Sequence, residues 1–262
     1  MTESTVLVSR DDRGVTTVTL NRPALHNAFD DALIQKLIET FESVAADDAC
    51  RVMVLAGAGK SFSAGGDLNW MRRMAGYSHA ENLADAGELA RLMRTLDRLP
   101  KPTVARIQGA VFAGGLGLVS CCDVAVAEQD TIFSVSEARL GLVPSVISPY
   151  LVRAIGARMA RRYFLTAERF SAAEAHRIGL VHEVVPVAEL DQKVEAIVTA
   201  LLEAGPSAQT RSKRLISEVT DRPIEQPVIE ITARTIAEAR ASDEAREGLA
   251  AFFEKRKPDW RR

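Results

Sequence analysis

The sequence has 262 residues, of which 47% are hydrophobic and 26% are charged, and its formal net charge is −2. This balance is typical of a soluble globular protein with a sizeable core, either one large domain or a domain with an appendage. A nearly neutral chain has no overall basic field for nucleic acid. We therefore expect no nucleic-acid partner, and only a local basic cluster would change that expectation.

The longest nearly apolar stretch, residues 110–122, is shorter than the roughly 20 residues that a membrane-spanning helix needs. The N-terminal residues include Glu3, Arg10 and Asp12 rather than an apolar segment, so we expect no signal peptide and no membrane partner. The three cysteines lack the spacing of a disulfide framework or a zinc site. These features predict a cytoplasmic protein with reduced, buried cysteines and no metal.

In chain order, the first two thirds of the sequence predict strand pairs that alternate with helices. Stretches rich in β-branched residues at 6–9 and 15–20 flank a turn and predict a hairpin. Asp30 can cap a helix that ends near residue 46, because the apolar residues between them recur at helical spacing. The further elements are strands at 51–56, 103–108, 123–127 and 131–134 and helices at 67–74, 80–99 and 116–121. This alternation predicts an α/β fold of ββα units.

Strand signals stop after Pro186, and the rest of the chain predicts only helices. They cover residues 187–204, 207–219, 224–241 and 243–256, with breaks at Gly205-Pro206 and Arg222-Pro223. Their apolar faces need burial against the core, a partner subunit or both. We divide the chain into a core of residues 1–190 and a helical C-terminal region of residues 191–262.

Two glycine-bearing loops, residues 61–68 and 111–117, each follow a strand-like run and precede a helix-like one. Backbone N–H groups are free at such positions, and glycine lets a ligand approach closely. The amides of Gly66 and Gly114 could converge on one oxygen as an oxyanion hole, which stabilises an enolate or a tetrahedral anion. The alternative interpretation is that these glycines only form tight turns or pack a helix against a strand.

Glu137 follows the second loop and the predicted strand at 131–134. A carboxylate at this place could move protons beside the anion, and partial burial would raise its pKa towards the working pH. The alternative is a solvated helix-cap carboxylate or an ion pair with Arg139. The two loops and Glu137 together favour an enzyme.

These features, from Asn21-Arg22-Pro23 to the tail at 252–256, resemble the crotonase superfamily of enoyl-CoA hydratases and isomerases. The resemblance implies an α/β fold with a ββα spiral core and a helical C-terminal region that trimerises, and trimers that pair into hexamers. It implies that the amides of Gly66 and Gly114 hold the thioester oxygen of an acyl-CoA substrate while Glu137 activates water or transfers a proton. No cofactor is implied, because CoA is part of the substrate.

The resemblance also implies residues that contact CoA. They are Arg22, Ala24 and Leu25 beside the nucleotide, the backbone at Ala64, Asp67 and Leu68 along the adenine and pantetheine, and Lys255 near the phosphates. Lys255 belongs to the cluster Lys255-Arg256-Lys257, which could come from a neighbouring subunit. The alternative is that this cluster only stabilises a helix C-terminus.

One position departs from the family pattern. Hydratases of the best-known type have a second glutamate where this sequence has Gly117. With glycine there, Glu137 could act alone, as in the isomerases that move one proton between two carbons. Another group, or the substrate itself, could instead complete the water site, so this residue leaves both hydration and isomerisation open.

Several segments resemble the bacterial methylglutaconyl-CoA hydratase branch and its isohexenylglutaconyl-CoA relative. They are residues 67–71, 115–119, 145–150 and 160–166. This resemblance implies hydration of a branched, carboxylated enoyl thioester in leucine or isoprenoid degradation. The distal carboxylate of such a substrate needs a donor, for which Arg72, Arg73 and Ser148 are candidates. The side chains that could line the acyl chain are Trp70, Met71 and Met74.

Three alternatives to hydration remain at this stage. The nearest is a Δ3/Δ2-enoyl-CoA isomerase that uses a single glutamate, and a thioester hydrolase is a weaker one. The third is a non-catalytic homologue that binds RNA or acts as a scaffold, which the acidic charge balance and the intact glycine loops disfavour.

Overall fold

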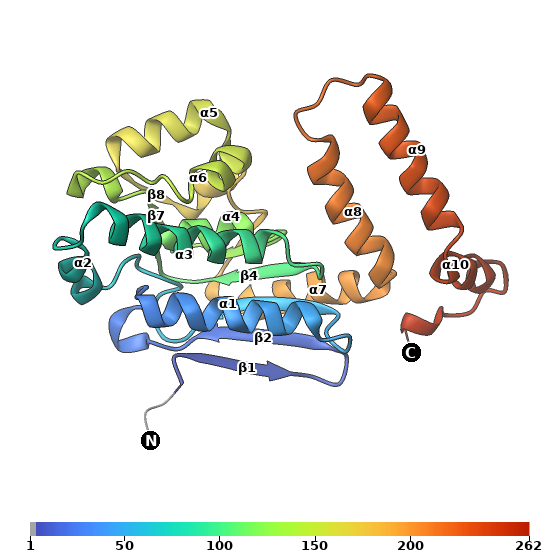
Figure 1. Cartoon of the computed structure of the whole chain (residues 1–262). Helices are drawn as coiled ribbons and strands as arrows, with labels where there is room; N and C mark the ends of the chain where they lie inside the picture. The colour runs from blue at the N-terminus through green and yellow to red at the C-terminus, as the bar shows by residue number, and fades with distance from the viewer. Residues whose placement is uncertain (1–3, 262) are drawn as a thin grey trace.

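The computed structural model describes residues 4–261 and begins with the predicted hairpin (Figure 1). Strands β1 (Val6–Arg10) and β2 (Val15–Leu20) pair antiparallel, with Val6 opposite Leu20. The carboxylate of Asp11 closes the turn by accepting the amides of Arg13 and Val15, as aspartate does in tight turns. The predicted hairpin is confirmed.

A six-stranded sheet forms the centre of the molecule, in the order β1-β2-β3-β4-β6-β9. Its further strands are β3 (Val52–Gly57), β4 (Thr103–Ile107), β6 (Val124–Glu128) and β9 (Glu183–Val185), and each pair from β2 onwards is parallel. Every residue of β3 is buried, which explains its continuous apolar sequence. Because β3 and β4 run parallel, the loops after them emerge at the same edge of the sheet.

A second sheet of three short strands lies beside the first, in the order β5-β7-β8. Strand β5 (Ala110–Phe112) pairs parallel with β7 (Ile132–Ser134), which pairs antiparallel with β8 (Arg169–Ser171). The sequence predicted β7 but neither β5 nor β8. Strand β7 contains Ile132 and Phe133, which favour strands, whereas β5 lies at the start of the second glycine loop and β8 has only Phe170 of this kind, so pairing alone identifies β5 and β8.

Helices cover both faces of the large sheet. On one face, α1 (Asp31–Ala46), α3 (His79–Asp97), α4 (Gly114–Cys121) and α5 (Ser148–Thr166) pack in succession around the main core. Asp30 caps α1 as predicted, since its side chain accepts the Leu33 amide at 2.8 Å. The sequence predicted no helix at 148–166. This helix is interrupted by Gly156, whose φ of 72° is non-helical.

Helix α7 (Leu190–Glu203), preceded by a short 3-10 helix (Val187–Glu189), covers the other face. Its residues Leu190, Val194 and Val198 form a second core cluster with valines of the sheet. The predicted division at residue 190 would separate α7 from the sheet that buries it. By packing, the core extends through α7 and ends near Gly205.

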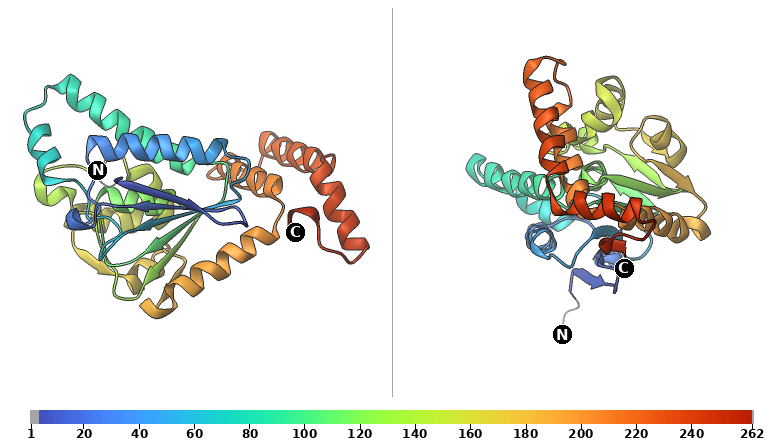
Figure 2. Two further views of the ribbon diagram at one scale, coloured as in Figure 1. Left: turned by 90° about the horizontal axis from the view of Figure 1, so that it is seen from below. Right: turned by 90° about the vertical axis from the view of Figure 1, so that its right-hand side faces the viewer.

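The last three helices, α8 (Pro206–Val219), α9 (Gln226–Arg240) and α10 (Asp243–Phe253), stand apart from the sheets (Figures 1 and 2). Lys213 anchors α8 to the core through an ion pair of 2.8 Å with Asp123. Only Val228 of α9 and Ala251 of α10 are buried, and α8 has no buried residue. The predicted helices are confirmed, and much of their apolar surface is not covered by this chain.

The remaining helical elements are short: α2 (Leu68–Met74), α6 (Ala172–Arg177) and 3-10 helices η1 (Pro23–Leu25), η2 (Glu137–Leu140) and η4 (Asp259–Arg261). None of the helices described is long and apolar enough to cross a membrane. Cys50, Cys121 and Cys122 are buried and form no disulfide. Residues 4–261 contain no group of three or more histidines, cysteines or carboxylates placed to hold a metal ion.

Candidate active site

The first glycine loop is held by backbone pairing with Phe29. The Phe29 amide donates to the Gly65 carbonyl at 2.7 Å, and the Asp67 amide donates to the Phe29 carbonyl at 2.7 Å. Because successive peptide groups of an extended chain point in opposite directions, the Gly66 amide faces away from Phe29. Within residues 4–261, this amide has no hydrogen-bond acceptor.

The second glycine loop is fixed by a different set of backbone bonds. The Phe112 amide donates to Ser63 at 2.9 Å, and the Ala113 amide donates to Ser134 at 3.0 Å. Ala113 has φ 47° and ψ −117°, a strained conformation for a residue with a Cβ, and such strain is concentrated at functional sites. Helix α4 begins at the next residue, so the Gly114 amide is one of the free donors of a helix N-terminus, and no acceptor for it exists in the described chain.

The two loops lie against each other, with Phe29 between them. A Cβ atom placed on Gly65 would lie 3.1 Å from the Cβ of Ala113. A Cβ atom on Gly114 would lie 3.0 Å from the ring of Phe29, whose side chain is buried. The fold therefore brings the two loops that carry the free amides of Gly66 and Gly114 together, and the convergence of these amides on one oxygen stays a prediction. Phe29 was missed because nothing in the local sequence distinguishes it from an ordinary core residue.

Glu137 is connected to the second glycine loop through the small sheet. It begins η2, three residues after Ser134, which accepts the Ala113 amide. Its side chain is partly buried, and Oε2 is enclosed without a hydrogen-bond partner in the described chain. Burial raises the pKa of Glu137 above its ordinary value. A buried carboxylate oxygen without a partner is unusual, and it suits a group that meets water or substrate.

At Gly117, where the sequence departs from the family pattern, the structure leaves no room for a side chain. A Cβ atom there would lie 2.5 Å from Cγ2 of Ile147 and 2.9 Å from both Sδ and Cε of Met93. Both neighbours are buried. The space that a second glutamate would need is filled by two apolar side chains.

Comparison with known proteins agrees with this geometry. Residues 10–262 match the family model described as enoyl-CoA hydratase/isomerase. The chain belongs to this family. It is an enzyme of the hydro-lyase type, and the predicted crotonase fold and superfamily are confirmed.

Relatives with solved structures or assigned names cover nearly the whole chain. An enoyl-CoA hydratase from Shewanella pealeana has 44% identity and a TM-score of 0.95, with 98% of this chain and 96% of that chain covered. The 2,3-dehydroadipyl-CoA hydratase of Escherichia coli is 30% identical over 98% of this chain and 99% of its own length. The crotonyl-CoA hydratase of Syntrophomonas wolfei is 29% identical, with 99% of both chains covered.

In this hydratase/isomerase family member, Arg22 ties two helix N-termini together. Its guanidinium lies 2.9 Å from the carboxylates of both Asp30 and Asp67, the N-caps of α1 and α2, and it also donates to the Ala28 carbonyl. Burial alone would raise the pKa of Asp67, but the hydrogen bonds to its carboxylate outweigh this, and the pKa is lowered. The Arg22 side chain is therefore engaged inside the protein, where the sequence predicted a nucleotide contact.

We expect Arg22→Ala to lower the free energy of unfolding by about 3 kcal/mol, because two largely buried carboxylates would lose their cation. Urea unfolding at pH 7 measures the change, and the exposed Arg158→Ala is the control. A variant with unchanged stability but a raised KM for acyl-CoA would instead make Arg22 a ligand contact only.

The other predicted CoA contacts fall into two groups. Ala24, Leu25 and Leu68 are exposed around the first loop. The Ala64 amide donates a hydrogen bond to the His26 carbonyl. Lys255 lies two residues after the end of α10, which is at the opposite end of the molecule from α2 (Figures 1 and 2). Lys255 could thus reach the glycine loops only from another copy of the chain.

The proposed donors for a distal carboxylate are surface groups in this chain. Arg73 pairs with Asp31 at 2.7 Å, Arg72 donates to Asn69 at 3.0 Å, and Ser148 Oγ donates to the Ser145 carbonyl at 2.7 Å. Among the apolar candidates, Met71 lies beside Gly66, since a Cβ on Gly66 would be 3.3 Å from its Cγ, and Trp70 is buried nearby.

Asn27 is a second residue that sequence reasoning missed. It is fully buried with φ 55°, a left-handed conformation that asparagine tolerates better than most residues. Its side chain accepts the Arg22 amide at 2.8 Å and donates to the carbonyls of Ala58 and Ser61. It thereby joins the turn before α1 to the first loop.

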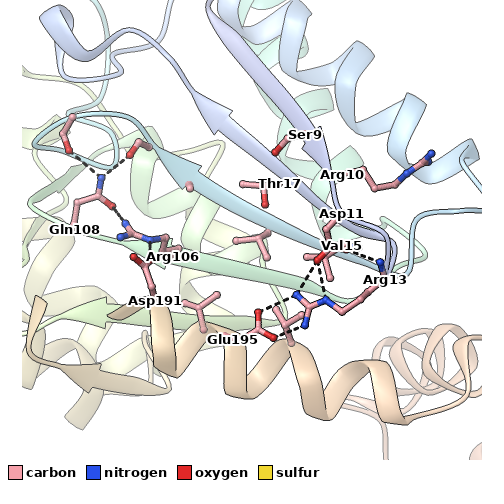
Figure 3. Close-up of a pocket in the computed structure, with 16 residues that line it drawn as sticks. Ser9, Arg10, Asp11, Arg13, Val15, Thr17, Arg106, Gln108, Asp191 and Glu195 are labelled. Carbon is pink, nitrogen blue, oxygen red and sulfur yellow. Dashed lines mark hydrogen bonds and ion pairs between the residues drawn. The ribbon is translucent and has the colours of Figure 1, made fainter. Parts of the chain in front are cut away.

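A cavity of about 700 Å³ lies elsewhere, between the first hairpin, β4 and α7 (Figure 3). Its charged groups neutralise one another: Arg106 pairs with Asp191, and Arg13 pairs with Glu195. None of the predicted site residues lines it. The cavity therefore gives no reason to move the candidate site away from the glycine loops.

Proposed function

We propose that the protein adds water across the double bond of a branched, carboxylated 2-enoyl-CoA thioester of the 3-methylglutaconyl type. The observation that carries the proposal is the buried carboxylate oxygen of Glu137, which has no hydrogen-bond partner in the described chain. Glu137 follows strand β7 of the small sheet, and Ser134 of this strand holds the second glycine loop in place. This loop and its neighbour each carry a free amide. Hydrogen-bond donors in a water-excluded site stabilise a developing anion, and one such donor contributes roughly 3–4 kcal/mol to lowering the barrier.

In the proposed reaction, the thioester carbonyl oxygen accepts the amides of Gly66 and Gly114. Glu137 takes a proton from water, and the resulting hydroxide oxygen bonds to Cβ. The electron pair of the double bond moves towards the thioester, whose oxygen carries the enolate charge between the two amides. Glu137 then returns a proton to Cα, so that one water is added and the carboxylate is regenerated. CoA stays attached to the acyl group throughout, and the residues require no cofactor for these steps.

The substrate class rests on two supports. The similarity to the methylglutaconyl-CoA hydratase branch runs through the segments around both loops, and one relative is named for a thioester of a dicarboxylic acid, 2,3-dehydroadipyl-CoA. Another relative is named for crotonyl-CoA, which has neither branch nor carboxylate. A direct comparison of the two kinds of substrate therefore decides this part of the proposal.

An isomerase is the second candidate, because Gly117 leaves Glu137 as the one carboxylate that the predicted motif supplies. In that reaction Glu137 would take a proton from Cα of a 3-enoyl thioester and return it to Cγ, while the two amides hold the oxygen of the intervening dienolate. The RNA-binding or scaffolding alternative would be revived by salt-sensitive RNA binding without any acyl-CoA affinity.

Assembly into trimers or hexamers is part of the proposal. The exposed apolar side chains of the last helices and the segments between and after them include Ile216, Ile224, Ile236, Phe252 and Phe253. Burial of this apolar surface against a second copy of the chain would stabilise the assembly. Light scattering after size exclusion would give the mass, and a monomer at micromolar concentration would contradict the proposal.

The function is tested by incubating the purified protein with 3-methylglutaconyl-CoA and, separately, with crotonyl-CoA. The loss of the conjugated-enoyl absorbance gives the rate, and the product mass identifies the reaction. We expect a gain of one water on the branched substrate and little turnover of crotonyl-CoA. A shifted double bond without a change in mass would support the isomerase, and release of free CoA would indicate a hydrolase.

A further inference from the structure

Gly117 lies one helical turn after Gly114 on α4, so the two positions share a face of the helix. The helix that begins with Ser148 packs against both α4 and η2, the element that carries Glu137. Ile147, the residue before that helix, lies against the position of an added Gly117 Cβ, and the helix that follows it also packs against the element that carries Glu137. Met93 reaches the same place from α3, which packs against α4 on another side.

The two neighbours of Gly117 differ in how easily they can move. The clashing atom of Ile147 is Cγ2, which is attached directly to Cβ of a β-branched side chain and is 2.5 Å from the position of an added Cβ. The clashing atoms of Met93 are at the end of a flexible side chain. Ile147 is thus the rigid obstacle, and Met93 can adapt.

We infer that Ile147 is a specificity-determining residue. Its methyl group occupies the space of a second carboxylate and gives the site an apolar wall beside Gly117. This wall excludes a second polar partner for water, and it offers van der Waals contact to a methyl branch on Cβ of the substrate. A straight-chain enoyl-CoA would leave that contact unmade. The inference deepens the proposed function and rests on it.

The test uses four variants: Ile147→Ala, Gly117→Glu, the double variant and Gly87→Glu. Gly87 is the matched control, because it lies in α3 and no atom lies within 4 Å of a Cβ placed there. For each variant, Tm is measured together with kcat/KM on 3-methylglutaconyl-CoA and on crotonyl-CoA, across pH.

We expect Ile147→Ala to lower the preference for the branched substrate about tenfold, the size of effect that small changes in an apolar pocket produce. Gly117→Glu should lower Tm by at least about 4 °C more than Gly87→Glu, because it overfills a packed site. Adding Ile147→Ala should restore part of that loss. The double variant should also gain crotonyl-CoA hydration and a second ionisation in its pH profile.

An unchanged substrate preference in Ile147→Ala would overturn the inference, as would equal Tm values for Gly117→Glu and Gly87→Glu. The claim that Ile147 fills the space beside Gly117 is tested by the Tm values alone, so its test does not depend on any activity. If the wild type turned over neither thioester, the proposed function itself would fail. If the wild type hydrated the branched thioester but Ile147→Ala kept the same substrate preference, only the inference about Ile147 would fail.

Discussion

Replacement of Glu137 by glutamine is expected to lower kcat about a thousandfold, within the range that general acid–base groups contribute. The amide has nearly the same shape but cannot accept the proton of water. Binding of acyl-CoA should be unchanged, because the two loop amides and the CoA contacts remain. Single-turnover kinetics and a separate titration with a non-reactive acyl-CoA measure the two quantities. The matched control is Glu189→Gln, at an exposed carboxylate in a short helix of the core.

The same variant should be more stable than the wild type at neutral pH. Burial raises the folded-state pKa of Glu137 above its ordinary value of 4.5, so the folded protein holds this proton more tightly than the unfolded chain does. Stability is therefore lost as pH rises through that window, and glutamine removes the loss. The Tm difference between variant and wild type should be larger at pH 7 than at pH 4.

Two results would contradict the assignment. A glutamine variant with a near-wild-type rate would show that Glu137 does not transfer the proton. A variant that lost both activity and acyl-CoA binding would place Glu137 in substrate binding instead. For the wild type, activity should fall as pH drops through the raised pKa, because the carboxylate must be ionised to accept a proton.

Gly114→Ala is expected to lower kcat by about 100-fold or more, the effect of losing one oxyanion donor. The added Cβ would lie 3.0 Å from the Phe29 ring, so either the ring or the Gly114 amide must shift. Because Phe29 also pairs with the first loop, a shift would disturb both amides. A β-branched residue here would overlap the buried ring further, so it would cost stability as well as rate, and alanine gives the cleaner test.

The control is Gly87→Ala, where the added Cβ meets open space in a helix and should slightly raise stability. Combining Gly114→Ala with Phe29→Leu should return part of the rate, since the smaller side chain makes room for the Cβ. Thermal unfolding and kcat are measured for each variant. If Gly114→Ala kept the wild-type kcat, or if the double variant gained nothing, the role assigned to Gly114 and Phe29 would be wrong.

An element could be predicted from the sequence where the residues that determine it lie close together in the chain. The first hairpin, the cap at Asp30 and the helix opened by Asp67 were predicted because turn, cap and periodicity lie within a few residues. Strands β5 and β8 were not predicted, because β5 lies at the start of a glycine loop and β8 has one strand-favouring residue, so only their pairing with β7 identifies them. The division at residue 190 stays a prediction, and the sequence left open whether the core or a partner subunit buries α7, since an apolar helix face does not reveal which surface buries it.

The sequence by itself determined the family, the two glycine loops, Glu137 and the missing second glutamate at Gly117, because these are properties of residue type and spacing. Only the tertiary structure decided what surrounds them. Phe29 lies between the two loops, Arg22 is committed to two helix caps, and Ile147 fills the space beside Gly117. These contacts join residues far apart in the chain, and packing in three dimensions selects them, so no local pattern could encode them.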